Sequence, residues 1–416
     1  MKVENIIAEI HNHLENIHTG CFPGMDKPVL LISEEYPGVW LEQVYDSVFY
    51  ARLDKTKLPL AENTIRLFLS YQKEDGQLPC YIWDARRVCV PEDELVGYSQ
   101  IQECVSFARL CYETYEMNRD LDFLREVYRA CGAWAEWLFR NRTTTNRGLI
   151  EMFVGYDTGH DNSGRLEGLS CHGNYLVNGV LQNASVLPPN DEVAPILAVD
   201  INCIYFGTLS ALSEMARALS LEDEAEAYLS RAKNIKENIF RYLYCAEDCF
   251  FYDVDKNGNM RKYLSSTILH LFLEGVLDPE DDKALIDEIC RRHIFNPNEF
   301  YTPYPFPSMA ISDPSTVGHP TFNCWGYYTQ GLIAMRTTRW MERYGFTKQF
   351  DSLCKTWVDV WTRLFDTVKL AQELDPITGE PTACSEWYSA TMLFYLYSAK
   401  RLGYNIKKGE ACPSDK

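Results

Sequence analysis

The sequence of 416 residues predicts an all-α protein in which helical hairpins form a closed ring. Apolar residues recur at three- and four-residue spacing along most of the chain, which is the pattern of amphipathic helices. The helices follow one another in pairs but lack a repeat of about 20–50 residues, which disfavours an open solenoid. No low-complexity linker or break in composition occurs, so we expect one domain over residues 1–416.

The helical pattern can be followed in order along the chain. One example is the series Leu209, Leu212, Met215 and Leu219. Strand signals are few, and the best are residues 151–154 and 250–254. The loops 156–190 and 295–320 are long for a compact domain, which is typical of functional loops. We predict helices over residues 4–18, 41–53, 60–72, 100–115, 121–141, 201–219, 222–243, 264–274, 281–292, 324–344, 350–370 and 387–402.

Composition and charge limit the class of ligand. The chain has 59 acidic and 40 basic residues, a net charge of −19, and no Lys/Arg-rich run. Nucleic-acid and anionic-membrane partners need a basic surface, so we expect neither. Aromatic residues make up 13% of the chain, with 26 Tyr and 9 Trp. Such side chains stack on sugar rings, although composition alone favours a large aromatic core.

The cysteines and the N-terminus indicate the compartment. The 15 cysteines are scattered and form no paired C-x-x-C motif, so we expect reduced thiols and no zinc site. The first 17 residues alternate in charge and lack the apolar segment of a signal peptide. No apolar run is long enough to cross a membrane. These features predict a cytoplasmic protein.

Two acidic segments are candidates for catalysis, because inverting cleavage of a glycosidic bond needs two carboxyl groups on opposite faces of the sugar. In residues 155–165, Asp157 and Asp161 share a glycine-containing loop with Arg165. A neighbouring carboxylate favours the protonated form of one acid, and an arginine favours the ionised form of another. An Asx turn explains the same residues equally well. In residues 372–381, Glu373 follows a helix, but residue types alone favour an exposed acidic turn there.

These two segments resemble the catalytic motifs of known glycosidases. D-T-G-H-D-N-S-G-R at 157–165 resembles the E-S-G-x-D-x-S-x-R loop of trehalases. It also resembles the E-S-G-x-D-N-S-P loop of the mannosyl-oligosaccharide glucosidase and mannosylglycerate hydrolase family. The general acid of these families falls on Asp161, and Asp157 replaces their leading Glu. Q-E-L-D-P-I-T-G-E-P at 372–381 resembles the E-x-Y-(D/N)-P-x-T-G-x pattern, which places the general base on Glu373, with Leu374 in place of an aromatic residue.

Further segments resemble the same families in the same order, from about residue 40 to residue 400. Residues 198–205 match the P-V-D-L-N-x-x-L-Y helix, residues 40–53 match the W-D-S-x-F helix with Tyr45 in place of Trp, and Gln100 remains from S-Q-P-P. Residues 318–332 match a G-P-x-W helix loosely. The resemblance implies an (α/α)6 barrel with long loops over one end.

The resemblance also implies an inverting glycoside hydrolase that cleaves a terminal α-linked sugar, an α-glucoside or α-mannoside, from a small glycoside or oligosaccharide. It implies no cofactor and no metal. Asp161 would be the general acid, assisted by Asp157, and Glu373 the general base about 6.5–9.5 Å away. His160 is expected to be a solvated side chain, and Arg165 to orient Asp161 or bind an anionic aglycone. The residues expected to bind substrate are Trp40, Tyr45, Asp46, Gln100, Asp157, Arg165, Asn202, Tyr205, Trp325 and Trp387.

Three alternatives remain open at this point. A sugar epimerase on the same barrel would use histidine bases, but three of the eight histidines, His11, His13 and His18, lie outside the matched region. A non-catalytic carbohydrate-binding protein would keep the pocket without the chemistry. An unsaturated-uronide hydrolase would need arginines in its pocket. Residues 295–320 are equally compatible with a lid and with a surface brace, and the sequence leaves the oligomeric state open.

Overall fold

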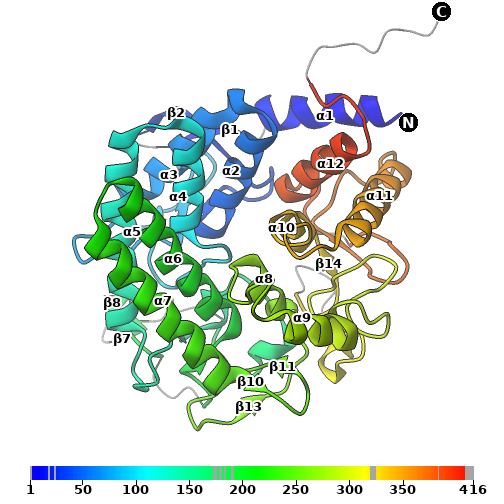
Figure 1. The fold of residues 1–416 in the computed structure, drawn as a ribbon. Coiled ribbons are helices and arrows are strands. Elements are labelled where there is room, and N and C mark those ends of the chain that lie inside the picture. Colours follow the sequence, from blue (N-terminus) through cyan, green and yellow to red (C-terminus); the bar gives the residue numbers. More distant parts are fainter. Residues whose placement is uncertain are drawn as a thin grey trace, which may run out of the picture.

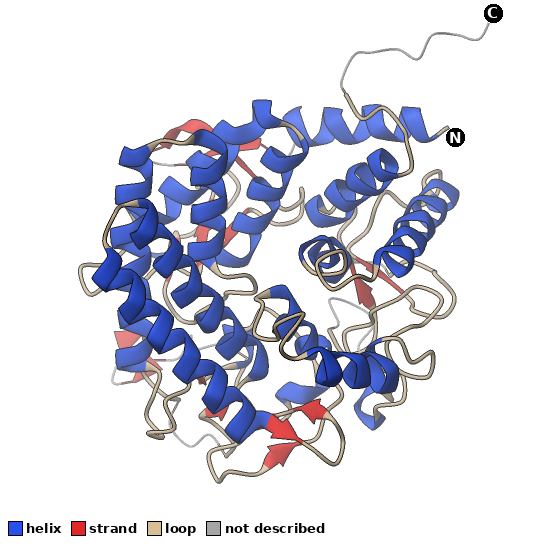
Figure 2. Cartoon of the chain, in the orientation of Figure 1, coloured by secondary structure: helices blue, strands red, loops and turns tan. Residues whose placement is uncertain are grey.

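The computed structural model describes residues 2–16, 19–22, 25–171, 176–177, 180–181, 184–188, 192–318, 325–382 and 384–407. These residues form a helix-rich structure, as the periodicity predicts (Figures 1 and 2). No helix in the described ranges is long and apolar enough to cross a bilayer. The described part contains twelve α-helices: α1 (Val3–Asn16), α2 (Val44–Leu53), α3 (Leu58–Ser70), α4 (Phe107–Asn118), α5 (Leu121–Asn141), α6 (Val199–Ala218), α7 (Glu222–Leu243), α8 (His270–Leu273), α9 (Lys283–Ile289), α10 (Gly331–Arg336), α11 (Thr347–Leu364) and α12 (Ser389–Arg401).

The even-numbered helices pack against one another in succession. Helix α2 contacts α4, α4 contacts α6, and α6 contacts α8, while α10 contacts α12 and α12 returns to α2. We call these six the inner helices. The odd-numbered helices pack outside them, with α3 on α2, α5 on α4 and α6, α7 on α6, and α11 on α12. Burial agrees with this order, because almost all of α6 is buried whereas α7 buries one stripe of residues.

Helix α5 shows why the outer helices follow the sequence closely. Its predicted and observed limits are both residues 121–141. The carboxylate of Asp120 caps the helix by accepting hydrogen bonds from the backbone N–H groups of Asp122 (2.8 Å) and Phe123 (3.2 Å). One apolar face, which includes Leu124 and Trp134, is buried against the inner helices. A strong cap and a single apolar face define such a helix locally.

Several inner helices begin later than the periodicity indicates, and α4 and α10 show the reason. Helix α4 starts at Phe107 instead of residue 100, where the Ser106 side chain caps it by accepting from the Arg109 N–H (3.1 Å). Helix α10 starts at Gly331 instead of residue 324 and follows a short strand. In both cases the apolar residues before the helix are buried in loops, and a buried loop gives the same periodic signal as a helix.

Short strands are more numerous than expected, because strands of two or three residues leave little pattern in a sequence. Within the predicted segments 151–154 and 250–254, residues 151–152, 250–251 and 253–254 form strands. Strands β6 (Glu151–Met152), β9 (Ile196–Leu197), β12 (Asp253–Val254) and β13 (Met260–Arg261) form an antiparallel sheet in the order β13-β12-β9-β6. The others are β3 (Gly38–Trp40), β4 (Tyr81–Trp83) and β5 (Val96–Gly97) in one sheet, and the pairs β1 (Thr19–Phe22) with β2 (Met25–Leu30), β7 (Leu176–Val177) with β8 (Val180–Leu181), β10 (Tyr244–Cys245) with β11 (Phe250–Phe251), and β14 (Thr329–Gln330) with β15 (Glu373–Leu374).

The loop 295–320 is anchored over its described part, residues 295–318. Phe300, Phe306 and Met309 are fully buried, and Met309 forms a β-bridge with Ser265. The Tyr304 N–H donates to the carbonyl of Pro376 (3.0 Å). This part of the loop is therefore packed as a brace. Residues 319–320 lie outside the described ranges, as do residues 172–175, 178–179, 182–183 and 189–190 of the loop 156–190.

The interior between α4 and α5 contains a carboxyl group, Glu103. It is 1% exposed and accepts hydrogen bonds from the Phe107 N–H (2.6 Å) and the Trp134 indole N–H (3.0 Å). Burial raises its pKa from 4.5 to about 7, and these two donors only partly oppose the shift.

We expect Glu103→Gln to flatten the dependence of stability on pH. The folded state holds the Glu103 proton more tightly than the unfolded state. The contribution of this group to the free energy of unfolding is therefore complete below pH 4.5 and is lost as the pH rises to about 7. Between pH 4 and pH 8 the free energy of unfolding of the wild type should fall by roughly 3 kcal/mol more than that of the variant. Urea titrations at both pH values measure the difference, with the exposed Glu116→Gln in α4 as control. Parallel pH profiles for wild type and Glu103→Gln would contradict the prediction.

Candidate active site

A polar cavity of about 180 Å³ lies at the N-terminal ends of three inner helices. At about 30 Å³ per water, this is the space of about six water molecules, which suits a small ligand. Glu42 and Gln43 directly precede α2, Leu332 lies in the first turn of α10, and Tyr388 is the residue before α12. Helix N-termini favour negative charge nearby, so acidic side chains are well placed here. The remaining lining residues are Ile32, Tyr36, Trp40, Gln100, Gln102, Tyr156, Gly159, Asp161, Trp325 and Gln372.

Asp161 lines the cavity and belongs to the loop that follows β6. Its backbone carbonyl accepts a hydrogen bond from the N–H of Trp325 (3.0 Å), which also lines the cavity. Four of the residues expected from the sequence thus meet at this cavity: Asp161, Trp40, Gln100 and Trp325. They come from segments separated by up to 285 residues, so their convergence is a property of the fold.

Glu373 lies in β15, beside the cavity but fully buried. Its carboxylate accepts hydrogen bonds from the Gln330 side-chain amide (3.1 Å) and the Thr382 hydroxyl (2.9 Å). The preceding residue, Gln372, lines the cavity and accepts from the Tyr36 hydroxyl (3.2 Å). Burial raises the pKa of Tyr36, and the charges of Asp161, Glu42 and Glu373 add to the shift. Tyr36 is therefore within the electrostatic field of both expected catalytic carboxylates.

Asp157, expected to bind substrate, instead anchors the start of the Asp161 loop. It is fully buried and forms a two-point ion pair with Arg142, with N–O distances of 2.7 and 3.1 Å. Its carboxylate also accepts from the backbone N–H groups of Ile101 (2.7 Å), Phe153 (2.7 Å) and Val154 (3.1 Å). Asp157 does not line the cavity, and Arg142 compensates its charge, so it gives Asp161 little electrostatic assistance.

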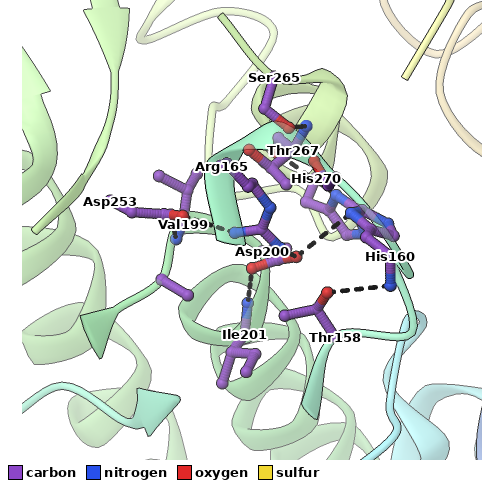
Figure 3. Close-up of polar contacts among 12 residues, drawn as sticks. Thr158, His160, Arg165, Val199, Asp200, Ile201, Asp253, Ser265, Thr267 and His270 are labelled. Carbon is purple, nitrogen blue, oxygen red and sulfur yellow. Dashed lines mark hydrogen bonds and ion pairs between the residues drawn. The ribbon is translucent and has the colours of Figure 1, made fainter. Parts of the chain in front are cut away.

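Arg165, expected to orient Asp161 or bind an aglycone, anchors the end of the same loop (Figure 3). Its guanidinium lies between two buried carboxylates, 2.5 Å from Asp200 and 2.6 Å from Asp253. Asp253 belongs to β12, and Asp200 lies in the first turn of α6. Arg165 is 1% exposed and does not line the cavity, so its charge is used within the protein.

His160 is buried, which corrects the expectation of a solvated side chain. It is 2% exposed, and its ring stacks on Trp325 with a centroid distance of 4.4 Å. Burial lowers its pKa well below the ordinary value, and the charge of Arg165 lowers it further, so His160 is neutral. Burial and the charge of Arg336 similarly lower the pKa of His270, in α8, to about 3. The two histidine rings lie close together, with centroids 5.9 Å apart (Figure 3), and neither is among the residues that line the cavity.

Asp46 was matched to the sugar-contacting Asp of the W-D-S motif. It lies in the first turn of α2, four residues after Glu42. It is 1% exposed, does not line the cavity and accepts a short hydrogen bond from the Ser389 hydroxyl. Burial raises the pKa of Asp46 to about 7, against the opposing effects of Ser389 and the charge of Arg336. The other carboxylate oxygen of Asp46, Oδ1, is buried and has no hydrogen-bond partner among the described residues.

Four other residues expected to bind substrate have structural contacts away from the cavity. The Tyr45 hydroxyl lies 3.2 Å from the Thr338 hydroxyl, and that of Tyr205 accepts from Arg231 (2.9 Å). Asn202 bonds both the N–H and the carbonyl of Ile150 (2.7 and 2.9 Å). Trp387 stacks on His13 of α1, with ring centroids 3.5 Å apart. These contacts argue against the expected sugar-binding roles.

Sequence reasoning missed several cavity residues, above all Glu42 and Gln43. The spacing of Glu42 and Asp46 could have indicated Glu42, because residues four apart share one face of a helix. Gln102 was missed because residues 100–106 were assigned to a helix. Tyr36 and Gln372 carry no motif of their own.

Gly159 connects the Asp161 loop to Glu42. Its φ of +66° lies in the left-handed region, which favours glycine. A Cβ atom at this position would lie 2.1 Å from a carboxylate oxygen of Glu42 and 2.9 Å from the Cys104 sulfur. The absence of a side chain at Gly159 therefore lets Glu42 pack directly against the backbone of the loop.

Metal binding has no support in the described ranges, where no group of three or more His, Cys, Asp and Glu side chains is arranged to hold an ion.

We expect Asp157→Asn to destabilise the protein by about 3–5 kcal/mol, because it leaves the Arg142 charge buried without its partner. Chemical denaturation measures the loss. Since Asp157 does not line the cavity, the affinity of the folded protein for a sugar should be unchanged. Unchanged stability together with lost affinity would instead indicate direct contact with the ligand.

We expect Gly159→Ala to cost about 1–3 kcal/mol of stability, from backbone strain and from contact with Glu42. In the background of Glu42→Ala, which removes the facing carboxylate, the same change should cost less. A double-mutant cycle by thermal unfolding separates the two terms. Equal costs in both backgrounds would show that Glu42 does not restrict position 159.

Comparison with known proteins identifies the family and the fold of the chain. Residues 44–323 match the profile of the mannosylglycerate hydrolase MGH1-like glycoside hydrolase domain. A mannosylglycerate hydrolase of glycoside hydrolase family 63 from Thermus thermophilus, solved in complex with glucose, superimposes with a TM-score of 0.70 at 17% identity, over 94% of this chain and 99% of that chain. Neutral trehalase from Saccharomyces cerevisiae has a TM-score of 0.65 at 12% identity, over 97% of this chain and 80% of that chain. At these identities the likeness shows a shared fold.

One relative is an uncharacterized protein of Borreliella burgdorferi. It is 26% identical over 222 residues, which are 52% of this chain and 44% of that protein, so the match spans less than half of the relative's length. The family profile, in contrast, covers well over half of this chain. The chain therefore belongs to the mannosylglycerate hydrolase MGH1-like glycoside hydrolase family.

Proposed function

We propose that the protein is an inverting glycoside hydrolase that releases a terminal α-linked sugar, an α-glucoside or α-mannoside, from a small glycoside or oligosaccharide. The observation that carries this proposal is the meeting of Asp161 with the strand of Glu373 at one small cavity that aromatic and amide side chains line. A cavity of about 180 Å³ suits a single sugar ring better than a polymer. The resemblance to the mannosylglycerate hydrolase supports a small glycoside as substrate.

In this proposal Asp161 is the general acid and protonates the glycosidic oxygen. It faces the cavity and is the only acidic residue of its loop to do so, since Asp157 is paired with Arg142. Glu373 is the general base and removes a proton from the water that attacks the opposite face of the sugar. The Gln330 amide and the Thr382 hydroxyl both donate to Glu373, which stabilises the carboxylate form that a base requires.

The helix contacts support a closed (α/α)6 barrel as the scaffold of this site, formed by one domain over residues 1–416. The inner helices contact one another from α2 through α8 and from α10 through α12 back to α2. Their N-terminal ends supply the cavity walls. An epimerase that relies on histidine bases is less well supported, because His160 and His270 are buried and neither lines the cavity.

We expect Asp161→Asn and Glu373→Gln each to lower kcat by about 10²–10⁴-fold, which is the usual contribution of a general acid or base. The substrates are a panel of α-glucosides and α-mannosides that includes glycerate and disaccharide forms. NMR of the first product should show the β-anomer released from an α-linked substrate.

The matched control is Glu380→Gln, an exposed carboxyl in the same segment as Glu373, which should keep wild-type turnover. Release of the α-anomer would contradict inversion, and full turnover by either active-site variant would contradict its assigned role. Epimerised sugar without hydrolysis would favour the epimerase.

A further inference from the structure

Glu42 and Gln43 form a polar wall of the cavity that no motif assigned. Both belong to the short 3-10 helix Leu41–Gln43 in front of α2, and they are 8% and 6% exposed. The side-chain amide of Gln43 donates a hydrogen bond to one carboxylate oxygen of Glu42 (2.7 Å). This bond fixes the orientation of the Gln43 amide, because the reverse orientation would place its oxygen against a carboxylate. The Gln43 Oε1 atom is buried, and it has no hydrogen-bond partner among the described residues.

Neighbouring side chains donate toward Glu42 from the other side. The Ser99 hydroxyl donates to the Gln100 carbonyl oxygen (2.8 Å), and the Gln100 amide donates to Gln102 (2.7 Å). Gln102 in turn hydrogen-bonds to Glu42. The thiol of Cys104 also donates to Glu42 (2.9 Å). These bonds all run in one direction and end at the Glu42 carboxylate, so this carboxylate acts as the acceptor at the end of the chain.

A buried positive charge lies behind this wall. Arg336 of α10 is 4% exposed, and none of its guanidinium nitrogens has a hydrogen-bond partner in the described structure. Its charge lowers the pKa of Glu42, which opposes the larger upward shift that burial causes. Tyr36 and Tyr388 also face this region, and both are neutral because burial raises their pKa values. Arg336 therefore balances a Glu42 carboxylate, and the wall as a whole suits a neutral ligand.

We propose that Glu42 and Gln43 bind the hydroxyl groups of a terminal sugar ring, each accepting a hydrogen bond from a different hydroxyl. The Gln43 oxygen lacks a donor within the described structure, and the three donors to Glu42 leave one of the four lone-pair positions of its carboxylate for a further donor. A wall that presents two acceptors suits a ligand that brings two donors, which a sugar does. This inference rests on the proposed function in one respect, namely that the cavity takes a sugar. It assigns to Glu42 the contact that the W-D-S motif would give to Asp46.

The proposal is tested by measuring how much each hydroxyl group of a free sugar contributes to binding. Free D-glucose and D-mannose, and their 2-, 3-, 4- and 6-deoxy and deoxyfluoro analogues, are titrated into the full-length protein by calorimetry or by the fluorescence of the cavity tryptophans. Because these probes carry no glycosidic bond, the result does not depend on hydrolysis. We expect two ring positions at which loss of the hydroxyl weakens binding by at least about tenfold, since one partner is a charged acceptor.

The variants distinguish contact from support. In the Glu42→Gln variant, loss of the sugar hydroxyl at one of these positions should no longer weaken binding. The Gln43→Leu variant should show the same insensitivity at the other position. If Glu42 and Gln43 only support the structure, each variant should weaken the binding of all analogues equally, and loss of either hydroxyl should still weaken binding. That result would overturn the proposal. Failure of the wild type to bind either monosaccharide would overturn it as well, whether or not glycosides are hydrolysed. The exposed Glu226→Gln is the control and should reproduce the wild-type scan.

Discussion

The loop that carries Asp161 is held at both ends by buried arginines, and the form of the cavity depends on these ion pairs. Arg142 fixes Asp157 at one end, while Arg165 joins the other end to Asp200 and Asp253. Each arginine reaches a different part of the scaffold, so the loop is tied to α5, to α6 and to the small sheet. Removing one partner of a buried ion pair leaves an uncompensated charge and is costly, which keeps the backbone around Asp161 in place. A fixed support of this kind is what a catalytic acid needs to meet its substrate in one orientation.

The polar interior explains how acidic groups collect at this site in a chain with a net charge of −19. The cavity lies at the N-terminal ends of inner helices, whose dipoles favour negative charge. Arg336 lies beneath it and acts on Glu42 and Asp46 together. Asp46 and Glu42 nevertheless differ in environment, because Asp46 is enclosed beside Ser389 whereas Glu42 reaches the cavity. Helix geometry and one buried cation thus give two neighbouring carboxyl groups different surroundings.

The amphipathic outer helices could be predicted from the sequence, and α5 and α7 have the predicted limits, because a single buried face gives a clear period. The starts of α4 and α10 could not, since the buried loops before them are as apolar as a helix. Among the site residues, Asp161 lies on the cavity and Glu373 beside it. Asp157, Arg165 and Asn202 are occupied by contacts within the protein, and only the fold reveals those contacts. Motif matching marks which residues a family keeps, but it does not separate those that touch a ligand from those that hold the loops.

The missing side chain of Gly159 has a consequence for how this pocket can change during evolution or by design. The Glu42 carboxylate occupies the space that a Cβ atom at position 159 would need. Positions 42 and 159 are therefore coupled, although they are far apart in the chain. A lineage that acquires a side chain at 159 has to shorten residue 42 as well, and it would thereby alter the pocket wall next to the acid loop. Changes in the pocket wall at position 42 and changes in the Asp161 loop at position 159 are thus expected to occur as paired substitutions.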